Sequence, residues 1–189
     1  MIPLVPHPST PGAVALGVRA AAARTQRGQL ALRYRIEGEL GRLRIPPPRA
    51  PAPGERLWQH LCCEAFVAPA SAGAGLGAYR EFNFSPSGEW AAFEFQRYRE
   101  GGPVAVPDPR IAVRTDGQAL ELSASIEVGA AKLWLGLCVV IEEMDAAPSG
   151  AFSGAFSGAF SGAFSYWALR HPAARPDFHH PDGFALEIA

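Results

Sequence analysis

The chain has 189 residues, which is enough for one domain with a substantial hydrophobic core. With 48% hydrophobic and 19% charged residues, its composition is that of a soluble globular protein. The formal net charge of −1 gives no electrostatic reason to expect binding to nucleic acid or to an anionic membrane.

Cysteine usage and the N-terminal sequence indicate the compartment. Cys62 and Cys63 are adjacent on a predicted strand and face opposite ways, and Cys138 stands apart, so we expect reduced thiols. Residues 1–11 have no basic segment before an apolar run, which argues against a secretory signal. No stretch of about 18 apolar residues is present, so we expect no transmembrane helix and a cytoplasmic location.

The first third of the chain is expected to be extended. Prolines keep residues 1–12 out of a helix. Residues 13–24 are rich in alanine and therefore ambiguous, but their place before a strand-rich chain favours a strand. From 29 to 40 apolar and charged residues alternate, which predicts a half-exposed strand. The run PPPRAPAPG at 46–54 is typical of a polyproline-like surface loop.

Two runs at the centre of the chain alternate at period two, as half-buried strands do. The run at 57–69, LWQHLCCEAFVAP, would place alternate side chains on one face: Trp58, His60, Cys62, Glu64 and Phe66. The run at 79–98 would direct Phe82 and Phe84 to one face, and Glu81, Asn83 and Ser85 to the other. Pro86 and Gly88 predict the turn between its two strands.

The second half of the chain is also expected to be strand-rich. Asp116 and Gly117 form a strong turn pair, so a hairpin is predicted around them. The run KLWLGLCVVIE at 132–142 is the most apolar, which predicts a central strand with Trp134 packed in the core. The last strands are predicted at 163–170 and 184–188.

These patterns add up to about nine or ten short strands with no convincing amphipathic helix. They predict an all-β fold, an antiparallel and jelly-roll-like β-sandwich, formed by a single domain over residues 1–189. Residues 149–164 hold four tandem copies of Ser-Gly-Ala-Phe, a period too short for a solenoid repeat. We expect a lengthened loop there. A partner-binding role for its phenylalanines is the alternative.

Histidines and acidic residues near the C-terminus raise the question of a metal site. His171, Asp177, His179 and His180 cluster in the sequence, but neither a His-x-x-x-His nor a Cys-x-x-Cys spacing is present. We therefore predict no metal ligands. We also predict no catalytic residues, because the sequence has no nucleophile elbow and no glycine-rich phosphate loop before a helix.

Tryptophans and carboxylates point instead to a ligand-binding surface. Trp58 shares its predicted face with His60 and Glu64, so aromatic stacking and carboxylate hydrogen bonding are available together. This combination suits a polyol, because the C–H face of a sugar stacks on an indole and its hydroxyls donate to a carboxylate. A purely structural role is the equal alternative for Trp58, Glu64 and Trp90.

Three long runs resemble the DOMON-like bacterial proteins: LWQHLCCEAFVAP, YREFNFSPSGEWAAFEF and SYWALRHPAARPDFHHPDGFAL. The opening PLVPHPSTP and the segment LRIPPP are also similar, so the likeness covers nearly the whole chain apart from the repeat. The resemblance implies a β-sandwich like those of family-9 carbohydrate-binding modules and haem-binding DOMON cytochromes. Such domains bind sugar or haem in a sheet-lined pocket and are not hydrolytic in themselves. The axial methionine of haem-binding members has no clear match, since Met144 is the only internal methionine.

We therefore expect a non-catalytic domain that binds a small ligand, with carbohydrate as the first hypothesis. The expected ligand-binding residues are Trp58, His60, Glu64, Asn83, Trp90, Trp167 and His171. The second hypothesis is haem binding through His60, His171 or His179. A metal-dependent hydrolase and a scaffold that recruits protein partners are the two further alternatives.

Overall fold

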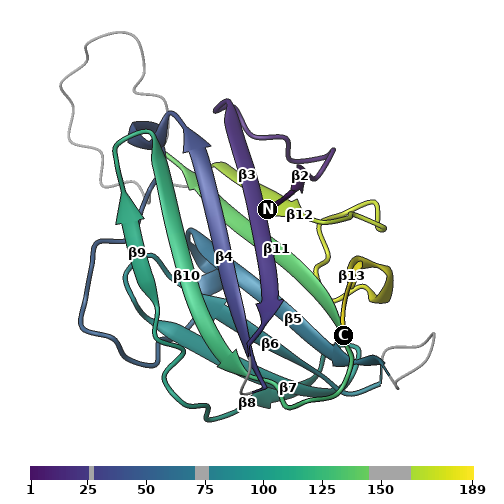
Figure 1. Ribbon diagram of the computed structural model, residues 1–189. Coiled ribbons are helices and arrows are strands. Elements are labelled where there is room, and N and C mark those ends of the chain that lie inside the picture. The colour runs from purple at the N-terminus through teal and green to yellow at the C-terminus, as the bar shows by residue number, and fades with distance from the viewer. Residues whose placement is uncertain (26–27, 71–76, 145–162) are drawn as a thin grey trace, which may run out of the picture.

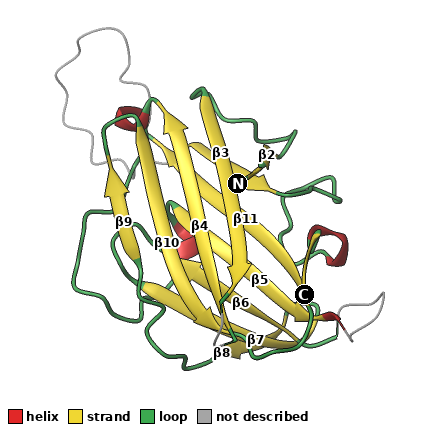
Figure 2. Cartoon of the chain, in the orientation of Figure 1, coloured by secondary structure: helices red, strands yellow, loops and turns green. Residues whose placement is uncertain are grey.

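The computed structural model describes residues 1–25, 28–70, 77–144 and 163–189. In this part of the chain, antiparallel strands form two sheets that pack face to face, as Figure 1 shows. The prediction of an all-β sandwich is confirmed. The helical elements are short 3-10 turns, drawn in red in Figure 2. These turns are η1 (Leu40–Arg42), η2 (Leu57–Gln59) and η4 (Pro181–Gly183).

The smaller sheet has five strands and lies in front in Figure 1. Its order is β1–β3–β4–β10–β9. Its strands are β1 (Ile2–Pro3), β3 (Leu16–Arg24), β4 (Gln29–Gly38), β9 (Ala112–Thr115) and β10 (Ala119–Glu127). The ambiguous run at 13–24 is thus a strand, and the turn at Asp116 and Gly117 joins β9 to β10, as predicted.

The larger sheet has eight strands in the order β2–β12–β11–β5–β6–β7–β8, and β13 pairs with the first part of β11. The apolar run at 132–142 forms β11, which lies inside the sheet as predicted. The strands are β2 (Val5–Pro6), β5 (Cys62–Pro69), β6 (Tyr79–Phe84), β7 (Trp90–Arg97), β8 (Glu100–Pro103), β11 (Leu133–Glu143), β12 (Ala163–Ala168) and β13 (Leu186–Ile188).

The hydrophobic core lies between the sheets and follows from the alternation of each strand. On β4, Leu30, Leu32, Tyr34 and Ile36 are fully buried and face the larger sheet. The Tyr34 hydroxyl donates a hydrogen bond of 2.8 Å to the backbone carbonyl of Glu64 on β5. This bond ties the two layers together directly behind the Glu64 side chain.

The outer face of the larger sheet is covered as well. The sequence predicted half-buried strands here, but seven of the eight residues of β5 are buried on one side or the other. The reason is the C-terminal segment, residues 169–185, which folds back over this face. Phe178, His179 and Phe184 from that segment pack with their rings edge-on to Phe66 of β5.

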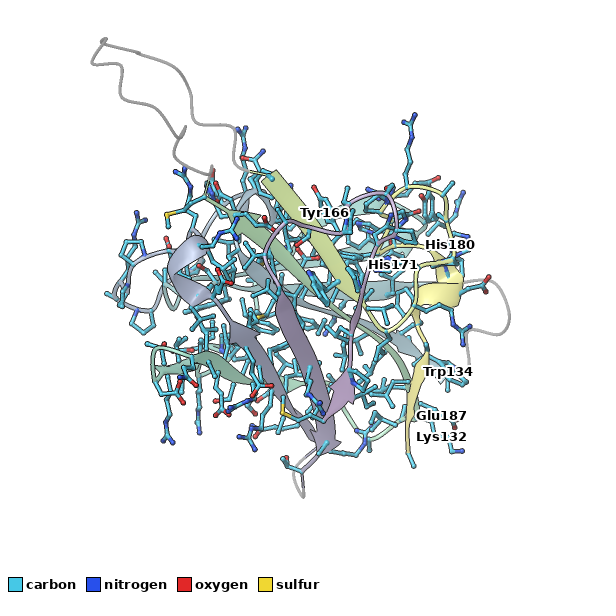
Figure 3. The ribbon with its side chains drawn as sticks, turned by 90° about the horizontal axis from the view of Figure 1, so that it is seen from above. Lys132, Trp134, Tyr166, His171, His180 and Glu187 are labelled. Carbon is cyan, nitrogen blue, oxygen red and sulfur yellow. The ribbon has the colours of Figure 1, made fainter. Side chains whose placement is uncertain are left out.

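Two further predictions about this region are wrong. Trp58 and His60 do not lie on the strand with Glu64, because the chain forms the 3-10 turn η2 there, after Arg56 in a left-handed conformation with φ of 52°. Trp134 is not in the core, because it lies on the outer face of β11 and is 38% exposed. Figure 3 shows it beside the ion pair of Lys132 and Glu187.

The described residues contain thirteen strands, more than the nine or ten predicted, because the sheets include very short strands such as β1, β2 and β8. The repeat at 149–164 lies outside the described residues, except for its last two residues, which begin β12. Among the described residues, none belongs to a helix with the length and hydropathy needed to span a bilayer.

The hairpin between β7 and β8 supports one wall of the site described below, and a glycine makes it possible. A β-carbon on Gly101 would lie 2.0 Å from the Glu94 carbonyl oxygen, whereas one on Gly102 would meet nothing within 4 Å. We therefore expect Gly101→Ala to lower the free energy of unfolding by about 1–3 kcal/mol. Gly102→Ala is expected to change it by less than about 0.5 kcal/mol. Urea denaturation checks this, and equal effects of the two substitutions would contradict the account.

Candidate functional site

The outer face of the larger sheet holds a cavity of about 380 Å³, a size typical of small-molecule sites. Strands of the sheet form its floor, while η2, the turn after β7 and the C-terminal segment form its walls. The residues that line it are Trp58, Glu64, Phe66, Glu81, Phe93, Phe95, Arg99, Val140, Tyr166, Pro176, Phe178 and His179.

Two carboxyl groups share the floor of this cavity. Glu64 on β5 is directly opposite Asn83 on β6, and Phe66 is opposite Glu81, so the two glutamates are diagonal neighbours on one face. Asn83 Nδ2 donates a hydrogen bond of 2.8 Å to Glu81 Oε1. The alternation of β5 and β6 therefore brings both acids and one amide to the same place.

The glutamates are desolvated. Glu64 is 3% exposed and Glu81 is 7% exposed. Burial, and next the repulsion from Glu81, raise the pKa of Glu64 well above its ordinary value. Burial also raises the pKa of Glu81, although the hydrogen bond from Asn83 and the charge of Arg99 oppose this. The floor thus holds acids that keep protons to an unusually high pH.

Two acceptor atoms at this floor have no hydrogen-bond partner among the described residues. They are Glu64 Oε1 and Asn83 Oδ1, and both are buried. An unpaired buried acceptor raises the free energy of the folded state, so the folded protein gains stability when a donor reaches it. Of these two residues Glu64 lines the cavity, so its unpaired oxygen is the acceptor placed beside a molecule that enters it.

A chain of polar contacts connects the wall to Glu81. The backbone N–H of Arg99 donates to the Tyr79 hydroxyl at 3.1 Å, and that hydroxyl lies 2.8 Å from His179 Nδ1. Burial, and next the charge of Arg99, lower the pKa of His179 to about 4, so the ring is neutral at neutral pH. The other ring nitrogen of His179, Nε2, lies 3.5 Å from Glu81 Oε2.

Asp177 fastens the C-terminal segment to the turn after β7. Its carboxylate accepts from the Tyr98 hydroxyl at 2.7 Å and from the Arg99 guanidinium at 2.9 Å. It also accepts from the backbone N–H of His179 at 3.1 Å. These bonds fix the position of Phe178 and His179 over the sheet.

Aromatic rings form most of the remaining wall. Trp58 is 41% exposed and packs edge-on to Phe93 with 5.6 Å between the ring centroids. A second cavity of about 390 Å³ lies on the other side of this pair and also touches Trp90. Trp58 therefore forms part of the rim of both hollows.

The predicted site residues are thus divided among several places. Trp58 and Glu64 line the cavity, and Asn83 supports it through Glu81. Trp90 and Trp167 lie mainly in the core between the sheets. Several residues outside the predicted set also line the site: Glu81, Phe93, Phe95, Arg99, Tyr166 and Phe178. The sequence pattern does place Glu81 on the same face of β6 as Asn83, so Glu81 could have been predicted as a site residue.

The remaining histidines of the predicted set make other contacts. His60 Nδ1 lies 2.9 Å from the buried Glu142 carboxylate, and His171 Nε2 lies 2.9 Å from the Val5 carbonyl. His171 also packs edge-on to His7 and so joins the C-terminal segment to the start of the chain. Neither His60 nor His171 lines the cavity on the outer face of the larger sheet.

Thiol and metal chemistry receive no support from the described residues. They contain no group of three or more histidine, cysteine or acidic side chains placed to hold a metal ion. The three cysteines are free and buried. Burial raises the pKa of the Cys62 thiol well above its ordinary value, which disfavours the thiolate that a nucleophile requires.

Comparisons with known proteins identify a protein with a similar fold, but they do not assign this chain to a family. No protein-family model matches the chain, and no curated protein matches it. Among solved structures, the chain is similar to a proposed carbohydrate-binding protein from Bacteroides uniformis ATCC 8492. The TM-score is 0.57 at 18% sequence identity, and the match covers 96% of this chain and 82% of the other. This likeness shows that the two proteins share a fold.

The raised pKa of Glu64 links protonation to stability. The folded protein keeps this proton to higher pH than the unfolded chain does, so its stabilising effect is lost as the pH rises through the raised pKa. Glu64→Gln removes this titration and keeps the shape of the side chain. We expect the variant to be more stable than the wild type at about pH 8, with the difference shrinking towards about pH 4.

Urea unfolding at the two pH values measures this difference. Glu100→Gln is the control, because Glu100 is the exposed first residue of β8 and its surface ion pair with Arg97 contributes about 0–1 kcal/mol. A Glu64→Gln effect that is the same at both pH values would contradict the assignment of a desolvated carboxyl group.

Proposed function

We propose that this protein is a non-catalytic domain that binds a carbohydrate in the cavity on the outer face of its larger sheet. The observation that carries the proposal is the combination of exposed aromatic rim and desolvated acceptor floor in a space of about 380 Å³. A sugar has both surfaces that such a site needs, because its C–H faces are apolar and its hydroxyls donate hydrogen bonds.

The geometry gives each half of the sugar a partner. Trp58 at the rim and Phe93 beside it offer ring faces and edges for the C–H surface. Glu64 Oε1 has an unused acceptor position on the floor, and Glu81 lies beside it. A sugar hydroxyl that donates to this buried oxygen supplies the hydrogen bond that the oxygen lacks in the unliganded protein.

One comparison and one expectation from the sequence support the same proposal. The expectation is the resemblance to DOMON-like proteins, whose relatives include sugar-binding domains, and it stays a prediction because no family model matches the chain. The structure is similar to that of a proposed carbohydrate-binding protein. The cytoplasmic location stays a prediction from the sequence.

Two exposed tryptophans give a matched test of this proposal. Trp58 lines the cavity, whereas Trp134 is similarly exposed, does not line it and lies away from Tyr166 in Figure 3. We expect a mono- or disaccharide from a broad glycan panel to change the tryptophan fluorescence of the wild type. Trp58→Ala is expected to weaken that binding by about tenfold or more, because buried tryptophan contacts dominate many binding sites.

Trp134→Ala is the control and is expected to leave the affinity unchanged. Calorimetric titration of both variants with the same saccharide provides the comparison. The proposal fails if no saccharide of the panel binds the wild type, or if Trp58→Ala binds as tightly as the wild type does.

A further inference from the structure

The cavity has more carboxyl groups than basic groups to pair with them. Three carboxyl groups lie in or beside the cavity: Glu64, Glu81 and Asp177. Among the described residues that line it, Arg99 supplies the one guanidinium, and that group donates to Asp177 and to the Tyr98 hydroxyl. His179 is neutral at neutral pH, because its pKa is about 4.

Glu64 is the carboxyl group with the fewest compensating contacts. Its Oε1 has no hydrogen-bond partner among the described residues, and the side chain is almost fully buried. Glu81 at least receives a hydrogen bond from Asn83 and the attraction of Arg99. A neutral hydroxyl could satisfy the free acceptor at Glu64, but it would leave the repulsion between the two glutamates in place.

A positively charged donor would satisfy both needs at once. An ammonium group has three N–H donors and a full positive charge, so it pairs with two neighbouring carboxylates. The surrounding rings add to this preference, since the faces of Trp58, Phe93 and Tyr166 attract cations. We propose that the preferred ligand is an amino sugar, whose free ammonium group is held by the carboxylates of Glu64 and Glu81.

This inference rests on the proposed function, because it specifies the class of sugar that the same cavity binds. It also predicts a proton exchange. Without a cation, the glutamate pair lowers its repulsion by keeping a proton, and an ammonium group takes the place of that proton. Binding of the amino sugar should therefore release a proton and become tighter as the pH rises from about 5 to about 7.

Other titratable groups lie around Glu64 and Glu81, and they are the same whichever sugar is tested. They come from the strands, from the turn after β7 and from the C-terminal segment: Tyr34, Cys62, Cys63, Cys138, Tyr79, Arg99, Tyr166, Asp177 and His179. A comparison of sugars that differ only at the amino position keeps their contribution constant.

The experiment compares matched sugars by calorimetric titration of the full chain. The sets are glucose, glucosamine and N-acetylglucosamine, together with the corresponding galactose and mannose derivatives. At about pH 7 we expect one amino sugar to bind about tenfold or more tightly than both its hydroxyl parent and its N-acetyl derivative. Titration in two buffers of different ionisation enthalpy should show proton release with that amino sugar alone.

Glu64→Gln keeps the size of the side chain and removes its charge. We expect this variant to bind the amino sugar and its hydroxyl parent within about threefold of each other. Glu94→Gln is the control, because Glu94 pairs with Arg80 and does not line the cavity. It should keep the preference for the amine, and thermal unfolding of both variants checks that they fold.

The outcomes separate this inference from the proposed function. If neutral and N-acetylated sugars bind as tightly as the amino sugar, the amine preference is wrong and the carbohydrate proposal stands. If the amino sugar binds without releasing a proton, or keeps its preference in Glu64→Gln, the role of the glutamate pair is wrong. If no sugar binds at all, both proposals fall together.

Discussion

The site depends on Asp177, which holds the C-terminal segment against the turn after β7. Its carboxylate accepts hydrogen bonds from Tyr98, from Arg99 and from the backbone of His179. Burial alone would raise the pKa of Asp177, but the hydrogen bonds from Tyr98 and Arg99 hold it below its ordinary value. The group therefore stays ionised and keeps Phe178 and His179 over the sheet. Without this cover, the outer face of the larger sheet would be an ordinary solvated surface.

Covering that face changes the chemistry of the side chains on it. In a sandwich with one wet face, Glu64 and Glu81 would be solvated acids of little consequence. Under the C-terminal segment, the two glutamates are desolvated acceptors among aromatic rings. In such an environment a hydrogen bond contributes more to the binding free energy of a polar ligand than it does in water. The tie between Tyr34 and the Glu64 backbone adds rigidity from the opposite side, since it anchors β5 to the smaller sheet.

Local patterns were enough to predict the strands and the two-sheet architecture, because alternation and turn residues act over a few positions. They were also enough to put Glu81 and Asn83 on one face of β6. They could not show that residues 169–185 return to cover β5, since that contact joins parts of the chain about a hundred residues apart, such as Tyr79 and His179. Trp58 reaches the same cavity as Glu64, although through the turn η2 rather than through a shared strand. The prediction that Trp134 lies in the core was wrong because an apolar strand inside a sheet can still expose a side chain on its outer face.

The most direct test of the account is the protonation of Glu64 in the folded protein, followed by carbon-13 NMR of glutamate carboxyl groups during a pH titration. Comparison with Glu64→Gln and Glu81→Gln assigns the two signals. The account predicts a carboxyl signal, absent in Glu64→Gln, that titrates well above the ordinary glutamate range. It also predicts that Asp177→Ala returns this titration towards the ordinary range by opening the cover. A Glu64 signal that titrates like an exposed glutamate in the wild type would contradict the account.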